Sequence, residues 1–86
     1  MRIVVWVSAS MQYVVLIHPA EEGGYWAEIP LLEGCYAQAE TLEDLLVEAR
    51  EAIGSHLEAL RADGQPIPIE SEVIIATVKV ESPAAA

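Results

Sequence analysis

The feature that most constrains this chain is a stripe of apolar residues at helical spacing. Its members are Leu42, Leu45, Leu46, Ala49, Ile53, Leu57 and Leu60, and apolar side chains that recur every three or four residues line one side of an α-helix. Thr41 can cap the first turn, where Glu43 and Asp44 favour the positive end of the helix dipole. Gly54 inside the helix indicates close packing, because glycine there costs about 1 kcal/mol relative to alanine. Gly64 ends the predicted helix.

Short segments rich in β-branched and apolar residues lie on both sides of this helix, and such residues suit a pleated sheet. The predicted strands are residues 12–17, 25–29, 35–39 and 73–80. The first two are joined by HPAEEGG, in which Pro19 opens a turn and Gly23 and Gly24 can adopt positive φ. This pattern predicts a hairpin.

The order of elements predicts an α+β fold, β-β-β-α-β, in which a mainly antiparallel sheet carries one long helix on one face. Residues 1–86 are expected to form a single domain. Residues 1–10 are either an N-terminal extension, since Met11 is an alternative start, or contribute an extra strand at residues 3–7. That apolar run is too short for a signal peptide or a membrane span. Residues 82–86 are expected to be a frayed tail.

The single cysteine, Cys35, is interpreted as part of a structural joint with Gly34 and Thr41, between the second hairpin strand and the helix. A nucleophilic thiol needs a base or a cation that stabilises the thiolate. The nearby charged residues are Glu33 and Glu40, which would raise the pKa of the thiol. A small apolar role is therefore expected for Cys35.

No other residues point to chemistry. His18 precedes a proline and His56 lies in the predicted helix, and with one cysteine they offer no zinc spacing. The prediction is a protein that is not an enzyme and has no metal and no cofactor. A single cysteine also favours a cytoplasmic location over a disulfide-forming compartment.

The charge balance of the chain indicates which kinds of partner it can bind. Fourteen acidic residues against four basic ones give a net charge of −10 at pH 7. Such a surface repels phosphate, so direct nucleic-acid binding is not expected. It suits a basic protein, and Glu48, Glu51 and Glu58, which lie off the apolar stripe, are the predicted partner-binding residues. The plainer alternative is acidity that only keeps the chain soluble.

The apolar content, 53% of the residues, is more than one helix stripe and one sheet face can bury. Tyr13 and Val15 alternate with other apolar residues, and Trp26 points opposite to Tyr25. A large exposed apolar face is unusual in a monomer. We therefore predict a homodimer or a higher homo-oligomer, with Trp6, Tyr13, Val15 and Trp26 as self-association residues.

Several short pieces occur in a specific order and spacing. They are Gly24-Tyr25, Ile29-Pro30, Gly34-Cys35, Thr41 with Glu43 before the long helix, and DGQPIP at 63–68. Together they make residues 11–68 similar to the HicB-like antitoxin domain. The sequence departs from that family at LLE (31–33), where Asp-Leu-Pro is frequent, and at AE (39–40), where Gly-Asp is frequent. Neither change disturbs the turn or the cap.

The resemblance implies a fold like a reduced ribonuclease H core. Residues 11–17 hold none of the carboxylates that ribonuclease H chemistry needs on its first strand, so nuclease activity is not expected. The resemblance also implies a partner: a small basic RNA-cleaving toxin, HicA, whose RNA surface this domain would cover. Many such antitoxins add a C-terminal DNA-binding domain. The sequence ends soon after Val80, so operator binding is not expected.

Two alternatives stay open beside an antitoxin. One is an orphan module of the same fold that serves as an oligomeric binding or scaffold protein without a toxin. The other is a small hydrolase that uses His18 or Cys35.

Overall fold

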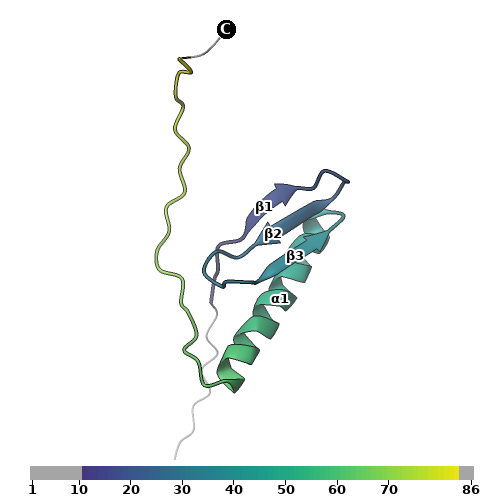
Figure 1. Cartoon of the computed structure of the whole chain (residues 1–86), viewed down its shortest axis with the longest axis vertical. Helices are drawn as coiled ribbons and strands as arrows, with labels where there is room; N and C mark the ends of the chain where they lie inside the picture. Colours follow the sequence, from purple (N-terminus) through teal and green to yellow (C-terminus); the bar gives the residue numbers. More distant parts are fainter. Residues whose placement is uncertain (1–10, 84–86) are drawn as a thin grey trace, which may run out of the picture.

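The computed structural model describes residues 11–83, and within them the chain forms a small sheet followed by one long helix (Figure 1). The elements are β1 (Leu16–Pro19), β2 (Tyr25–Glu28), β3 (Tyr36–Ala39) and α1 (Leu42–Ala62). The strands pair antiparallel in the order β1-β2-β3. This arrangement confirms the predicted α+β class and the β-β-β-α order. The likeness to a ribonuclease H core remains a prediction, and residues 3–7 lie outside the described residues.

The hairpin between β1 and β2 is closed by a turn that reaches the end of β3. The Ala20 N–H donates to the Gly24 carbonyl at 3.0 Å, and the Gly23 N–H donates to the Ala20 carbonyl at 3.1 Å. Gly24 has φ +75°, and a Cβ there would lie 2.7 Å from the Ala39 carbonyl oxygen. Only glycine allows the two backbones to approach this closely.

The core lies between the sheet and the helix. Its fully buried members are Ala27, Ile29, Leu32, Cys35, Leu45 and Ala49. The link between β2 and β3 forms part of this core, because Ile29, Leu32 and Cys35 are buried. Its backbone is also hydrogen-bonded: the Ile29 N–H donates to the Cys35 carbonyl and the Cys35 N–H to the Leu32 carbonyl. The strands therefore continue into a hydrogen-bonded loop rather than an open turn.

The helix begins and ends as its sequence predicts. The Thr41 hydroxyl accepts from the Asp44 N–H at 3.1 Å, which satisfies one of the free donors of the first turn. At the other end Gly64 has φ +69°, and the Gln65 N–H donates back to the Leu60 carbonyl at 2.9 Å. The helix packs against β3 and β2.

One side of the helix is left open. A Cβ built on Gly54 would meet nothing within 4 Å. The close packing that the sequence predicts around Gly54 is therefore not found within the described part of the chain. Leu46, about two helical turns closer to the N-terminus of α1, is 55% exposed.

The predicted final strand is the main correction. Residues 73–80 are extended but form no strand with the rest of the described chain, and Figure 1 shows this segment running past the sheet. A strand needs backbone hydrogen bonds to a neighbour, and residues 73–80 make none with the rest of the described chain. The chain is held just before this segment, where the Val14 N–H, ahead of β1, donates to the Glu70 carboxylate at 3.3 Å.

Among residues 11–83, no helix is both long and apolar enough to cross a bilayer.

Candidate partner-binding surfaces

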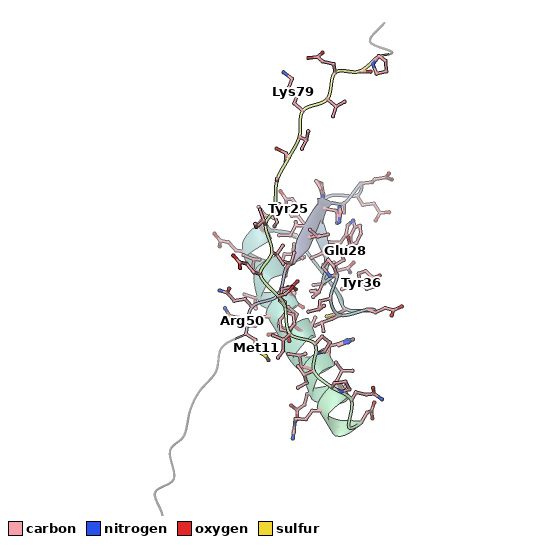
Figure 2. All side chains as sticks on the ribbon, turned by 90° about the vertical axis from the view of Figure 1, so that its left-hand side faces the viewer. Met11, Tyr25, Glu28, Tyr36, Arg50 and Lys79 are labelled. Carbon is pink, nitrogen blue, oxygen red and sulfur yellow. The ribbon has the colours of Figure 1, made fainter. Side chains whose placement is uncertain are left out.

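The outer face of the sheet carries an aromatic cluster. Because directly paired residues point to the same side, the register places His18 beside Trp26 and Glu28 beside Tyr36. These residues point away from the helix, since Ala27, between Trp26 and Glu28, is completely buried on the other face. Figure 2 shows Glu28 and Tyr36 close together, with Arg50 and Met11 on the opposite side.

The cluster contains one stacked pair and one tilted pair of rings. The His18 and Trp26 rings stack, with centroids 4.3 Å apart and an interplanar angle of 20°. The Trp26 and Tyr36 rings are tilted by 46°, with centroids 6.4 Å apart. The His18 Nε2 lies 3.4 Å from the Glu28 Oε1. Trp26 is 37% exposed and Tyr36 60% exposed, so their faces remain available to a partner.

A shallow depression joins this cluster to the hairpin end of the sheet. Its lining includes His18, Trp26 and Tyr36 together with glutamates. The glutamates are Glu21, Glu22, Glu40 and Glu48. No lysine or arginine from the described chain lines it. We call this surface, the three rings with their four glutamates, the acidic aromatic surface.

The predicted partner-binding glutamates of the helix do not lie together. Glu48 lines the acidic aromatic surface, whereas Glu51 and Glu58 are exposed farther along α1. Glu58 forms an ion pair with Arg61, and the hydrogen bond from this guanidinium, with its positive charge, lowers the pKa of the Glu58 carboxyl. Part of the negative charge of Glu58 is therefore matched within the chain.

The predicted self-association residues are likewise divided between surfaces. Trp26 lies on the outer sheet face. Tyr13 and Val15 instead pack against the core on the helix side, and the Tyr13 hydroxyl donates to the Pro68 carbonyl at 2.6 Å. Trp6 lies outside the described residues.

The joint at Gly34, Cys35 and Thr41 lies inside the fold. Gly34 has φ +82° at the turn before β3, and Thr41 caps the helix that follows. The Cys35 side chain is buried, and burial raises the pKa of its thiol. His18 points outward from the sheet while Cys35 is in the core, so the structure does not join them into a nucleophile–base pair.

We expect the Cys35 thiol to react slowly with a neutral disulfide reagent in the native protein and fast in urea. A buried thiol is both inaccessible and less ionised, and the thiolate is the reacting species. Absorbance of the released thiolate measures both rates. Native labelling as fast as labelling in urea would contradict this placement of Cys35.

The described residues also offer no metal site: among residues 11–83 there is no group of three or more His, Cys, Asp or Glu placed to hold an ion. Sequence reasoning missed the grouping of His18, Trp26 and Tyr36, which come from three different strands. The available signal was strand alternation, but it needs the exact register of both hairpins before it brings these rings together.

Known proteins resemble this chain over most of its length. The family model described as the HicB-like antitoxin of bacterial toxin–antitoxin systems matches residues 13–83. UPF0150 protein ssl0259 of Synechocystis sp. is 44% identical over 75 residues, which are 86% of this chain and 100% of that protein. UPF0150 protein ssr1765 of the same organism is 39% identical over 62 residues, which are 72% of this chain and 78% of that protein.

One relative carries a functional name. Antitoxin HicB 1 of Photorhabdus laumondii is 33% identical over 64 residues, which are 74% of this chain and 41% of that protein. The family match extends from the first strand through the C-terminal segment, and it confirms the resemblance found in the sequence. On these matches, the chain belongs to the HicB-like antitoxin family.

Proposed function

We propose that this chain is a non-catalytic antitoxin that neutralises a small basic toxin by binding it. Family membership supports a toxin as the kind of partner. The observation that carries the proposal is the acidic aromatic surface, whose lining combines four glutamates with the rings of His18, Trp26 and Tyr36 and includes no lysine or arginine of the described chain. Lysine and arginine side chains of a partner can pair with the glutamates and lie over Trp26 and Tyr36.

The mode of inhibition follows from the sign of the charge. An RNA-cleaving toxin must present a basic surface to phosphates, and a protein with a net charge of −10 competes for that same surface. Inhibition then requires only that the antitoxin cover this surface and exclude RNA. The proposed location is the cytoplasm, where the RNA substrate is.

The test first asks whether a small basic protein is encoded beside this gene, and then measures how such a protein binds two matched double variants. Glu21→Lys with Glu22→Lys alters the acidic aromatic surface, and Glu51→Lys with Glu58→Lys alters the outer helix by the same charge. We expect the first variant to weaken binding at least about tenfold and to release RNA cleavage. We expect the second mainly to slow association slightly, through the overall charge. Calorimetry and an RNA-cleavage assay measure both effects.

The outcomes separate the two surfaces. A larger loss with the Glu51/Glu58 variant would move the toxin site to the outer helix and contradict the role of the acidic aromatic surface. Equal, small losses of affinity with both variants would also contradict the role of the acidic aromatic surface, without assigning the toxin site to the outer helix. Association that does not slow as salt rises would argue against a charge-steered complex.

The alternative function, a scaffold or binding module without a toxin, is favoured by the exposed apolar residues 73–80. Absence of binding to the neighbouring basic protein, together with intact self-association, would support it. Under both functions we propose that the chain acts as a homodimer or a higher homo-oligomer.

A further inference from the structure

The sheet is narrower than the apolar side of the helix. An apolar groove lies between α1 and the chain that leads into β1, and Gly54 and Leu46 form part of its helix wall. Tyr13 and Val15 form part of its opposite wall. Because α1 packs against β3 and β2, this groove is where a further strand beside β1 would place its inward side chains.

The edge of β1 is open in the same place. The strand order β1-β2-β3 makes β1 an edge strand, with one row of backbone groups unpaired by the rest of the described sheet. Leu16 and Ile17 on this edge are 41% and 37% exposed. An edge strand flanked by an apolar groove is a template for strand addition.

Residues 73–80 have the complementary pattern. One alternation, Ile74, Ala76, Val78 and Val80, contains no polar residue, whereas the other contains Thr77 and Lys79. Ile74 is 88% exposed and Val78 83% exposed. Residues 73–80 therefore have the sequence pattern of a strand, but no neighbouring strand in the described chain forms hydrogen bonds with them.

The same chain does not supply that partner. Pro68 and Glu70 are held beside residues 13 and 14, just ahead of β1, by the Tyr13 hydroxyl and the Val14 N–H. Beyond this point the segment leaves the molecule and runs past β1 (Figure 1). The lining of the groove at Gly54 accordingly includes none of residues 73–80 of the same chain.

We propose that residues 73–80 of one copy add as a strand to the β1 edge of a second copy. Residues 73–80 of the second copy add in the same way to the β1 edge of the first. Ile74, Ala76, Val78 and Val80 enter the partner's groove above Gly54. The exchange is self-complementary, so a two-fold dimer satisfies both edges and both segments. This inference rests on the self-association proposed above and is independent of the toxin.

The test is complementation between two full-length variants. Gly54→Leu places a bulky side chain in the groove, and its first carbon has room because a Cβ at this position meets nothing within 4 Å. Ile74→Asp with Val78→Asp places carboxylates on the inserted alternation. Light scattering after size exclusion at micromolar concentration should give twice the 9.3 kDa chain mass for the wild type and one chain mass for each variant. An equimolar mixture of the two variants should recover a dimer, because one intact segment and one intact groove remain.

The matched control is Ile75→Asp with Thr77→Asp, which adds the same charge to the opposite alternation and should stay dimeric. Circular dichroism checks that every variant keeps its helix. A monomeric wild type would overturn both the exchange and the self-association. A dimer that survives both groove and segment variants, or variants that never complement each other, would overturn the exchange alone. A third outcome is a Trp6→Asp variant that is monomeric while the Ile74→Asp/Val78→Asp variant stays dimeric. This result would assign the groove to the N-terminal residues and would also overturn the exchange.

Discussion

Leu45→Ala is expected to lower the free energy of unfolding by about 3 kcal/mol. Leu45 is completely buried, on the side of α1 that faces the sheet, and its removal leaves a cavity that the short strands cannot close. Domains of this size have only about 5–15 kcal/mol of stability in total. The melting temperature should fall by roughly 10–25 °C, since each kcal/mol corresponds to roughly 4–8 °C.

Val47→Ala provides the control for this loss. Val47 lies two residues along the same helix and is 54% exposed. Alanine is the better helix former, so this variant should match or slightly exceed the wild type. Urea unfolding of both variants at one fixed protein concentration separates the effects from those of association. Equal stabilities for the two variants would mean that α1 does not bury Leu45 against the sheet.

The second large effect is expected at the hairpin turn. Gly24→Ala should cost about 2 kcal/mol or more, because an alanine would be held at φ +75° with its Cβ 2.7 Å from the Ala39 carbonyl oxygen. To relieve this clash, the turn must move away from the end of β3. The glutamates of the acidic aromatic surface at the turn, Glu21 and Glu22, would move with it.

Gly34→Ala isolates the role of the clash. Gly34 has φ +82°, close to that of Gly24, but a Cβ there meets nothing within 4 Å. This variant carries the backbone strain alone and should lose less stability than Gly24→Ala in the same urea titration. A loss at Gly34 as large as at Gly24 would mean that the approach of the turn to β3 contributes nothing.

The elements that the sequence predicts correctly are those whose determinants are local. Thr41 and Gly64 bound the helix through hydrogen bonds to residues within five positions, so the two ends can be predicted from the residues around them. The first two strands are similarly defined by the turn between them, where Gly24 is required. The predicted first strand, 12–17, was nevertheless wrong at both ends: β1 is Leu16–Pro19, and Pro19, expected to open the turn, pairs with Tyr25. The second strand was predicted one residue too long, since β2 ends at Glu28.

Residues 73–80 show where this reasoning stops. Their composition predicts a strand, but a strand needs a hydrogen-bonding partner that composition cannot supply. Just before this segment, the Glu70 side chain accepts from the Val14 N–H across more than fifty residues of sequence, a contact that composition does not reveal. The prediction of close packing around Gly54 was wrong for the same reason, because no neighbour in the described part of the chain lies within 4 Å of a Cβ built there.

The candidate site was predicted less well than the fold. The net charge alone indicated a basic partner. The helical spacing of the apolar residues placed Glu48, Glu51 and Glu58 on the exposed side of the helix. The sequence could not show that Glu48 shares a surface with Trp26, because this depends on how α1 is rotated over the sheet. Rotation and register are set by the whole core rather than by any one segment.

The order of the elements also affects how the protein is made. Each element of the meander packs against its neighbour in sequence, and chains with such local contacts fold fast. Residues 16–62, which hold the described strands and the helix, are synthesised before the apolar C-terminal segment. At the usual ~5–20 residues per second, the ribosome needs about 1–5 s more to add residues 63–86. The strands and the helix therefore leave the ribosome, and can begin to pack, before the apolar residues 73–80 emerge, so this segment is exposed only when most of the core that it could disturb is already available to pack.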